Sequence, residues 1–318
     1  MWALVEQDAQ YDPMSPVLTA FLLEMAEAID LPDALHCEMA HFTRFCDRIR
    51  DTYDRTVPYH CFAHAVDVAH VYLTLLLQLD ASSASSVSAV ATDPMDRAMV
   101  FLAAIAHDAG HPGTNNAHQM AMGTPLAKYG PHGTLEKYAV DVGWRIFEES
   151  GIGSSLAKNA MERAKRVFAK AILETDMDRH GASINALTQM EGTANLTEEQ
   201  HALLMHAADL STPTRRPFQC CLQRSIQCQR EFIQQGDIEK AAGLEPPDTF
   251  DRVRYDDTGG KELFRRCELD FAQHCVRPYL TALIKVWPAL QYLVTNLDEN
   301  VTAWQHHALT EWKAILQR

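Results

Sequence analysis

The chain has 318 residues, with 28 lysines and arginines against 42 aspartates and glutamates, a formal net charge of −14. This acidic balance argues against a duplex nucleic-acid binder, which needs clustered cations. Apolar residues make up 47% of the chain, which excludes wholesale disorder, and no apolar run reaches the roughly 20 residues that a transmembrane helix needs.

Apolar residues recur at three- and four-residue spacing along almost the whole chain, and sustained alternation is hard to find. This periodicity is typical of α-helices. Prolines such as Pro94 and Pro278 stand near the expected boundaries, where a missing N–H costs least. The pattern predicts an all-α chain with helices over residues 19–29, 37–53, 60–79, 96–107, 135–149, 157–176, 198–209, 217–235, 263–276, 279–297 and 303–316.

Two stretches interrupt this pattern. Residues 81–92 are rich in serine and alanine and are predicted to form a surface insertion. Residues 243–260 contain paired prolines and paired glycines, which predict a long loop near a pocket, because long loops in compact folds often cover functional sites. No linker separates two cores, so we expect residues 1–318 to form a single domain.

The cysteines and the N-terminal residues bear on the compartment. Eight cysteines are spread along the chain without a CxxC pair, which is typical of reduced core thiols rather than a disulfide scaffold. Residues 1–10 carry Glu6 and Asp8 where a signal peptide would have an apolar core. The sequence therefore predicts a cytoplasmic protein with no membrane segment in this chain.

Histidines and aspartates recur at helix-face spacing in three separate segments. His60 and His64 are four residues apart, His107-Asp108 is followed by His111, and His206 precedes Asp209 by three. Residues three or four apart share one face of a helix. Metal sites in helical bundles are built from such inward-facing side chains of different helices, so these segments predict a metal site.

The types of these residues indicate which metals the site would hold. Imidazoles and carboxylates without thiolate suit Zn²⁺, Mn²⁺ or Fe²⁺. Asp108 has two oxygens and could bridge to a second, harder cation such as Mg²⁺. Paired cations about 3.5–4 Å apart are the usual device for attacking a phosphate ester. The chain has no Walker A loop, GxSxG elbow or HExxH helix. The motifs for cradling a nucleoside triphosphate, for serine hydrolysis and for zincin chemistry are therefore missing from the sequence.

Four ordered motifs resemble the signatures of class I 3′,5′-cyclic nucleotide phosphodiesterases. They are YHCFAHAVDV at 59–68, HDAGHPGTNN at 107–116, ETDM at 174–177 and HAADLSTP at 206–213. The segments at 231–237 and 276–278 continue the likeness, which runs from about residue 15 to about residue 300. The resemblance implies a compact, multi-helix HD-type phosphodiesterase catalytic domain with a deep two-metal pocket.

The resemblance also implies a reaction, the hydrolysis of cyclic nucleotides to nucleoside 5′-monophosphates. A first metal, expected to be Zn²⁺, would be held by four residues, and a hydroxide bridging it to a second metal, Mg²⁺ or Mn²⁺, would attack phosphorus. His60 would protonate the departing 3′ oxygen as general acid, since an imidazolium is well matched to that task near neutral pH. The implied ligands of the first metal are His64, His107, Asp108 and Asp209.

The resemblance implies that His111, Glu136 and Thr175 order the waters of the second metal, and here the sequence departs from the family. Family members usually carry two histidines shortly after the equivalent of Glu136. This chain has Lys137-Tyr138-Ala139 instead. Part of the surroundings of the second metal must therefore be supplied by other residues.

The second departure concerns the purine base, which the family binds with a glutamine ten residues before the equivalent of Pro278. That position holds Glu268 here, with Gln273 as a weaker candidate, while Phe271 stands where the base-stacking phenylalanine is expected. An ionised glutamate only accepts hydrogen bonds, whereas an amide also donates. Preference between cAMP and cGMP stays open, with a lean toward cAMP or dual use. The resemblance implies further substrate contacts from Tyr59, Met177, Leu210 and Thr212.

Two alternatives remain open at this point. Another HD-type phosphohydrolase, acting on deoxynucleotides or a cyclic dinucleotide, would share the HD pair. A non-catalytic cyclic-nucleotide binder would keep the fold while losing the glutamine and the histidine pair. The partner expected in every case is a small-molecule nucleotide, and the sequence does not indicate an oligomeric state.

Overall fold

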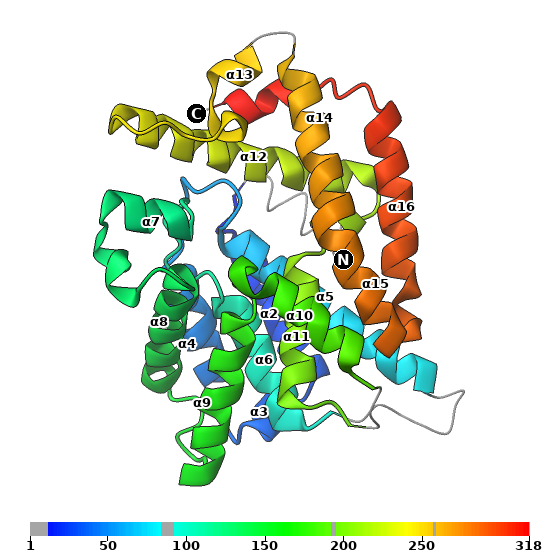
Figure 1. Ribbon diagram of the computed structural model, residues 1–318. Coiled ribbons are helices and arrows are strands. Elements are labelled where there is room, and N and C mark those ends of the chain that lie inside the picture. Colours follow the sequence, from blue (N-terminus) through cyan, green and yellow to red (C-terminus); the bar gives the residue numbers. More distant parts are fainter. Residues whose placement is uncertain (1–11, 84–91, 192–194, 257–258, 318) are drawn as a thin grey trace.

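The computed structural model describes residues 12–83, 92–191, 195–256 and 259–317, and this part of the chain is helical without a strand. The all-α prediction is therefore confirmed. The helices, shown in Figure 1, are α2 (Pro16–Ala28), α3 (Leu31–Ala34), α4 (Met39–Arg50), α5 (Phe62–Ser83), α6 (Pro94–Ala106), α7 (Asn116–Met122), α8 (Thr134–Ser150), α9 (Lys158–Leu173), α10 (His180–Gln189), α11 (Glu198–Asp209), α12 (Phe218–Ala241), α13 (Val253–Asp256), α14 (Gly260–Asp270), α15 (Arg277–Val286) and α16 (Gln291–His306).

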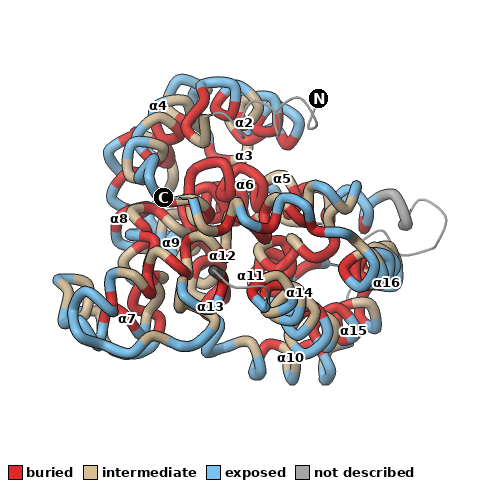
Figure 2. The backbone as a smooth tube through the Cα atoms, turned by 90° about the horizontal axis from the view of Figure 1, so that it is seen from above, coloured by how far each residue is buried: buried red, intermediate tan, exposed pale blue. Residues whose placement is uncertain are grey.

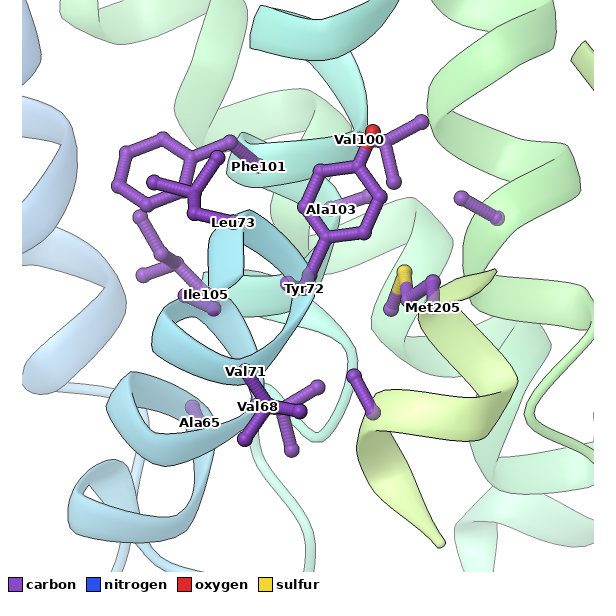
Figure 3. Packing of buried hydrophobic residues seen from close by; sticks show 14 of the residues in the cluster. Ala65, Val68, Val71, Tyr72, Leu73, Val100, Phe101, Ala103, Ile105 and Met205 are labelled. Atoms are coloured by element: carbon purple, nitrogen blue, oxygen red, sulfur yellow. The ribbon is translucent and has the colours of Figure 1, made fainter. Parts of the chain in front are cut away.

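The centre of the fold is formed by α5, α6 and α11, which pack on one another, with α9 against α6 and α11. From Ala98 to Ala106, α6 is apolar on every face and buried, as expected of a helix enclosed by others. Figure 2 shows α6 buried at the middle of the molecule, whereas α7 and α16 at the periphery carry exposed residues. Side chains of α5, α6 and α11 interlock in Figure 3, among them Val68, Tyr72, Phe101, Ile105 and Met205.

Local sequence sets the ends of these central helices. Asp93 caps α6 by accepting hydrogen bonds from the backbone N–H groups of Met95 and Asp96, and Pro94 occupies the first turn. Thr197 and Gln200 form a capping box at the start of α11. Because these helices begin at fixed residues, the residues at their far ends, including Asp209, are placed in a fixed register.

A second, smaller hydrophobic cluster lies outside this core. It joins α12, α13, α14, α16 and the C-terminal 3₁₀ turn Trp312–Leu316, and its largest members are Tyr255, Phe264, Trp304 and Trp312. In Figure 1, α12 crosses above the central helices, with α13 and the C-terminal segment beside it. The molecule therefore has two packed clusters, and the cavity described below is lined by residues from the helices of both.

Several predicted boundaries are wrong. The helix expected over 279–297 is divided into α15 and α16 by a 3₁₀ turn at Pro288–Leu290, because Pro288 cannot donate to the helical ladder. The helix expected over 303–316 is divided between the end of α16 and the turn Trp312–Leu316. The apolar pattern predicts no helix over α3, α7 or α10, and α12 runs on to Ala241, past the expected end at 235.

The two predicted irregular stretches differ in outcome. Most of the Ser/Ala-rich insertion at 81–92 lies outside the described residues, although α5 continues to Ser83. The predicted loop at 243–260 contains the turn Asp248–Phe250 and the short helix α13. Its backbone lies so close to α12 that a Cβ at Gly236 would stand 2.1 Å from the carbonyl oxygen of Phe250. Only glycine permits this approach.

One stretch of α5, Phe62–Asp80, is long and apolar enough to cross a membrane, but 78% of its apolar segment is buried inside the fold. Its composition is accounted for by its place in the central core, against α6 and α11. All eight cysteines are free thiols.

Candidate active site

Three helices of the central core bring the predicted metal ligands together. His64 lies in the first turn of α5, His107 and Asp108 directly follow α6, and Asp209 is the last residue of α11. His64 Nε2 lies 3.0 Å from Asp209 Oδ1 and 3.7 Å from Asp108 Oδ2. His107 Nε2 lies 3.0 Å from Asp108 Oδ2 and 3.5 Å from Asp209 Oδ1. Both imidazoles are buried, so the four side chains enclose one small volume.

The hydrogen bonds of this cluster leave room for a cation. His107 Nδ1 lies 2.8 Å from the carbonyl oxygen of Ala104, to which it donates, and this contact turns Nε2 toward the carboxylates. Although buried, His107 Nε2 and Asp108 Oδ2 have no hydrogen-bond partner among the described residues. Buried polar atoms are nearly always satisfied, so two imidazole nitrogens and two carboxylates without full pairing fit a divalent cation.

Electrostatics keeps both carboxylates in the form that binds metal. Burial opposes ionisation of Asp108, but the facing imidazoles of His107 and His60 hold its pKa well below its usual range. Burial likewise opposes ionisation of Asp209, and the facing imidazoles of His107 and His64 lower its pKa below the usual value. Metal ligands must be deprotonated, so both carboxylates are in the form that binds a cation.

His60 forms a separate cluster with a glutamate that the sequence had not singled out. Glu231 on α12 accepts hydrogen bonds from the backbone N–H groups of Tyr59 and His60, each 3.0 Å long. Its other oxygen lies 2.5 Å from His60 Nδ1. The His60 ring stacks on His111 with 4.2 Å between centroids. With Nδ1 held by Glu231, His60 presents Nε2 as its other proton-carrying atom.

The pKa of His60 reflects this pairing. Burial alone would lower it, but the carboxylates of Glu231 and Asp108 outweigh burial and raise the pKa to about 9. The neighbouring His111 has the opposite shift, since burial and the charge of His60 lower its pKa to about 4. At neutral pH the pair therefore consists of a protonated His60 and a neutral His111.

Glu136 and Thr175, predicted to surround a second metal, both lie close to buried polar groups. Glu136 in the first turn of α8 accepts a hydrogen bond of 3.0 Å from Asn116, and burial, together with the charges of Asp176 and Asp108, raises its pKa to about 7. Thr175 is buried and donates to the carbonyl oxygen of Ile172. Asn116 and the buried Asp176 were not predicted, although both stand within the quoted motifs.

The positions after Glu136 do not replace the family's histidines. Lys137 extends away, with its ammonium donating to the carbonyl oxygens of Tyr129 and His132. Tyr138 packs over Gly110, where a Cβ would lie 2.8 Å from the tyrosine ring. Gly110 also has a φ of 78°, so the turn between Asp108 and His111 requires glycine for two reasons.

His206, which the spacing paired with Asp209, lies outside the metal cluster. Its Nε2 is 3.0 Å from Nδ1 of His180 on α10, and its ring packs edge-on against Tyr279. His206 is fully buried and burial lowers its pKa to about 4, as in an ordinary core histidine. Helix-face spacing alone did not distinguish this residue from a ligand.

A cavity of about 280 Å³ connects the metal end with the predicted purine end. His60 and Asp209 line it at one end, and all six predicted substrate contacts also line it. The residues that line it and were not predicted include Ser225, Cys228, Gln229 and Phe232 of α12. The complete set of predicted substrate contacts is Tyr59, Met177, Leu210, Thr212, Glu268 and Phe271.

Glu268 and Phe271 line this cavity where the last turn of α14 passes into a π-helical segment, Phe271–Val276. π-helical turns are rare and occur frequently at functional sites. Glu268 Oε2 accepts a hydrogen bond of 2.5 Å from Ser225 Oγ. Gln273, the other candidate for the base, lines a different cavity with Asp270 and Gln305, so Glu268 is the residue that faces the pocket.

The segment at 243–260 supports the purine end from outside. Gln229 Nε2 donates to the carbonyl oxygen of Thr249 over 2.7 Å. Phe232 stacks on Phe250 with 4.6 Å between centroids and nearly parallel rings. The predicted loop therefore holds α12 side chains that line the cavity.

Comparison with known proteins agrees with this arrangement. The family described as 3′5′-cyclic nucleotide phosphodiesterase matches residues 59–297. The curated 3′,5′-cyclic-nucleotide phosphodiesterase regA of Dictyostelium discoideum is 24% identical over 298 residues, covering 91% of this chain and 36% of that protein. The chain thus spans just over a third of the length of this curated relative.

Solved structures with similarly low sequence identity share the fold. The structure of LmjPDEB1 in complex with IBMX has a TM-score of 0.80 at 23% identity, covering 92% of this chain and 87% of the other. The phosphodiesterase domain of the RhoPDE fusion protein from the choanoflagellate Salpingoeca rosetta has a TM-score of 0.81 at 23% identity, covering 92% and 90%.

Proposed function

This chain belongs to the 3′,5′-cyclic nucleotide phosphodiesterase family, and on that premise we propose that it hydrolyses 3′,5′-cyclic nucleotides to nucleoside 5′-monophosphates. The observation that carries this proposal is one cavity with a His/Asp cluster at one end and an aromatic ring beside a carboxyl group at the other. The His/Asp cluster, with cations bound, would hold the charged phosphate of such a nucleotide, and the aromatic ring would stack on its flat purine.

The first metal is proposed to be Zn²⁺, held by His64, His107, Asp108 and Asp209. The support is a set of borderline-to-hard ligands without thiolate, with two buried ligand atoms that lack hydrogen bonds. A second cation, Mg²⁺ or Mn²⁺, is proposed beside Asp108, with His111, Glu136 and Thr175 around it. When bound, such a pair supplies charge neutralisation of the phosphate and a more acidic attacking water.

His60 is proposed to protonate the departing 3′ oxygen. Its Nδ1 is held by Glu231 at 2.5 Å, which fixes the ring and leaves Nε2 toward the cavity that His60 lines. Glu231 is itself fixed by two backbone N–H groups, so the pair cannot rotate freely. A proton donor with a pKa of about 9 is charged at neutral pH, as general acid catalysis requires.

The purine is proposed to lie on Phe271, with Glu268 at its polar edge. Phe271 is 38% exposed although it is a large aromatic residue, so part of its ring is available to a ligand. Tyr59 and Thr212 are joined by a hydrogen bond of 3.0 Å between their hydroxyls and line the same cavity. We propose cAMP as a substrate, with cGMP as a second one.

A substrate panel tests this function. The metal-supplemented protein is incubated with cAMP, cGMP, deoxynucleoside triphosphates and a cyclic dinucleotide, and products are separated by chromatography. Release of AMP or GMP with the phosphate on the 5′ oxygen is the expected result. Hydrolysis of only the triphosphates or the dinucleotide would assign the chain to another HD-type activity, and saturable binding of cAMP without turnover would indicate a non-catalytic binder.

A further inference from the structure

Glu268 is an unusual group to find in a purine pocket, because no cation among the described residues acts on its carboxyl. The residues that line the cavity include no lysine or arginine. The only other carboxylate among them, Asp209, belongs to the metal end. Among the described residues, burial and one hydrogen bond from Ser225 are the effects that act on the Glu268 carboxyl.

The titratable groups near Glu268 come from three helices and are neutral at neutral pH. Cys221 and Cys228 of α12, Tyr255 of α13 and Cys267 of α14 each have a pKa raised chiefly by burial. The charged neighbours on α14, Arg266 and Asp270, are exposed to solvent. The carboxyl therefore stands among thiols, a phenol and one hydroxyl, a setting that accommodates its neutral form as well as its charged form.

The two forms of a carboxyl group match different purines. A neutral carboxyl offers one donor and one acceptor side by side, which pairs with the adenine N6 amino group and an adjacent ring nitrogen. A carboxylate offers two acceptors, which pair with the N1–H and 2-amino group of guanine. The glutamine usual in the family offers one donor and one acceptor at every pH.

We propose that Glu268 sets the base preference of this chain through its own ionisation, favouring adenine when neutral and guanine when ionised. This inference rests on the proposed function. Ser225 assists by donating to one lone pair of Oε2, which fixes the carboxyl group and leaves Oε1 and the second lone pair of Oε2 for the base. Burial raises the pKa of Glu268 to about 7, so both forms are populated near neutral pH.

The test is an internal competition. Equal concentrations of cAMP and cGMP are mixed with the metal-loaded wild-type protein, and the ratio of their initial rates is measured between about pH 6 and about pH 8. Because both substrates compete for the same enzyme, the effects of pH on the metals and on His60 cancel in this ratio. We expect the cAMP-to-cGMP ratio to fall by about tenfold as pH rises across this range.

Two variants locate the effect. In Glu268→Gln the ratio should not vary with pH, since the amide does not titrate in this range. In Ser225→Ala the midpoint of the change should move to higher pH, because the lost hydrogen bond favours the charged form.

Three outcomes would contradict the inference. A flat ratio in the wild type, or an equal pH dependence in Glu268→Gln, would overturn it while leaving the proposed function intact. Failure to hydrolyse either nucleotide at any pH would overturn the proposed function and this inference with it.

Discussion

The two ends of the cavity are built on different principles. At the metal end, His64 and His107 stand on the large central core, are 3% and 2% exposed, and each faces a carboxylate at 3.0 Å. At the purine end, Ser225 and Glu268 stand on helices of the smaller cluster, and no cation acts on the carboxyl among the described residues. Charges compensate one another at the first end, whereas burial and one hydrogen bond act on the carboxyl at the second.

This difference has a consequence for substitutions. A change at the metal end leaves a buried charge without its counterpart, which costs both activity and stability. A change at the purine end alters which ligand is preferred, because the groups there are neutral or close to neutral.

The largest effect is expected from Asp209→Ala. Removing this carboxylate leaves His64 and His107 facing Asp108 alone, so the first metal loses a ligand. Turnover should fall by at least about 10³-fold, with loss of bound metal measured by atomic spectroscopy. The control, Asp47→Ala on the surface of α4, should retain both, and a metal-replete Asp209→Ala would contradict the assignment.

His60→Ala should reduce turnover by about 10²-fold or more, as expected for a lost general acid. Metal content should stay at the wild-type value, because the hydrogen-bond partner of the His60 ring is Glu231 rather than a ligand of the first metal. Parallel loss of metal would mean that His60 acts as a ligand instead.

Glu231→Gln tests how His60 is charged. A general acid must be protonated, so activity is lost as pH rises through its pKa. Glu231 is the main group that raises the pKa of His60 to about 9, and the amide removes that charge. The alkaline limb of the kcat/KM profile should therefore move to lower pH by about one unit. An unmoved limb would assign it to another group.

Phe271→Ala tests the purine end. Loss of a stacking ring should raise KM by about tenfold with little change in kcat and none in metal content. Val253→Ala, another exposed apolar residue outside the cavity, is the matched control. An unchanged KM in Phe271→Ala would remove the base from this end of the cavity.

The smallest effect concerns stability. The pKa of Glu268 is about 7 in the folded chain and about 4.3 in an unfolded one. The unfolded chain therefore releases this proton first, so the contribution of this carboxyl to stability is full below about pH 4.3 and is lost as pH rises through about 7. The full pKa difference corresponds to about 2.5 kcal/mol between pH 5 and pH 8, and solvent screening of the partly exposed Glu268 reduces the gain of Glu268→Gln over the wild type to about 1 kcal/mol. Denaturant unfolding at both pH values measures it, and equal differences would refute the buried carboxyl.

Much of the fold could be predicted from the sequence, for reasons visible in single elements. α11 has the predicted ends because Thr197 and Gln200 cap its start and the run of buried residues stops just before Asp209. The break between α15 and α16 was missed because apolar periodicity continues through Pro288. α10 was missed because few of its residues are apolar enough to mark a buried face, and only Ser183 and Leu187 are buried.

The two ends of the cavity were not equally predictable. Helix-face spacing indicated His64, His107 and Asp209, although the same spacing also suggested His206. Glu231 stands 171 residues from His60, and Ser225 stands 43 residues from Glu268. Contacts over such separations follow from how α12 crosses the bundle, and no local pattern encodes that crossing.

The central claim is that residues of α5, α6 and α11 hold a divalent cation beside His60. Crystals grown with Zn²⁺ and Mg²⁺, measured at the zinc absorption edge, test it most directly. The account predicts an anomalous peak about 2.0–2.2 Å from His64 Nε2, His107 Nε2 and an oxygen of Asp209. If crystals grown with Zn²⁺ showed no anomalous peak among these atoms, or showed the peak elsewhere, the account would be contradicted.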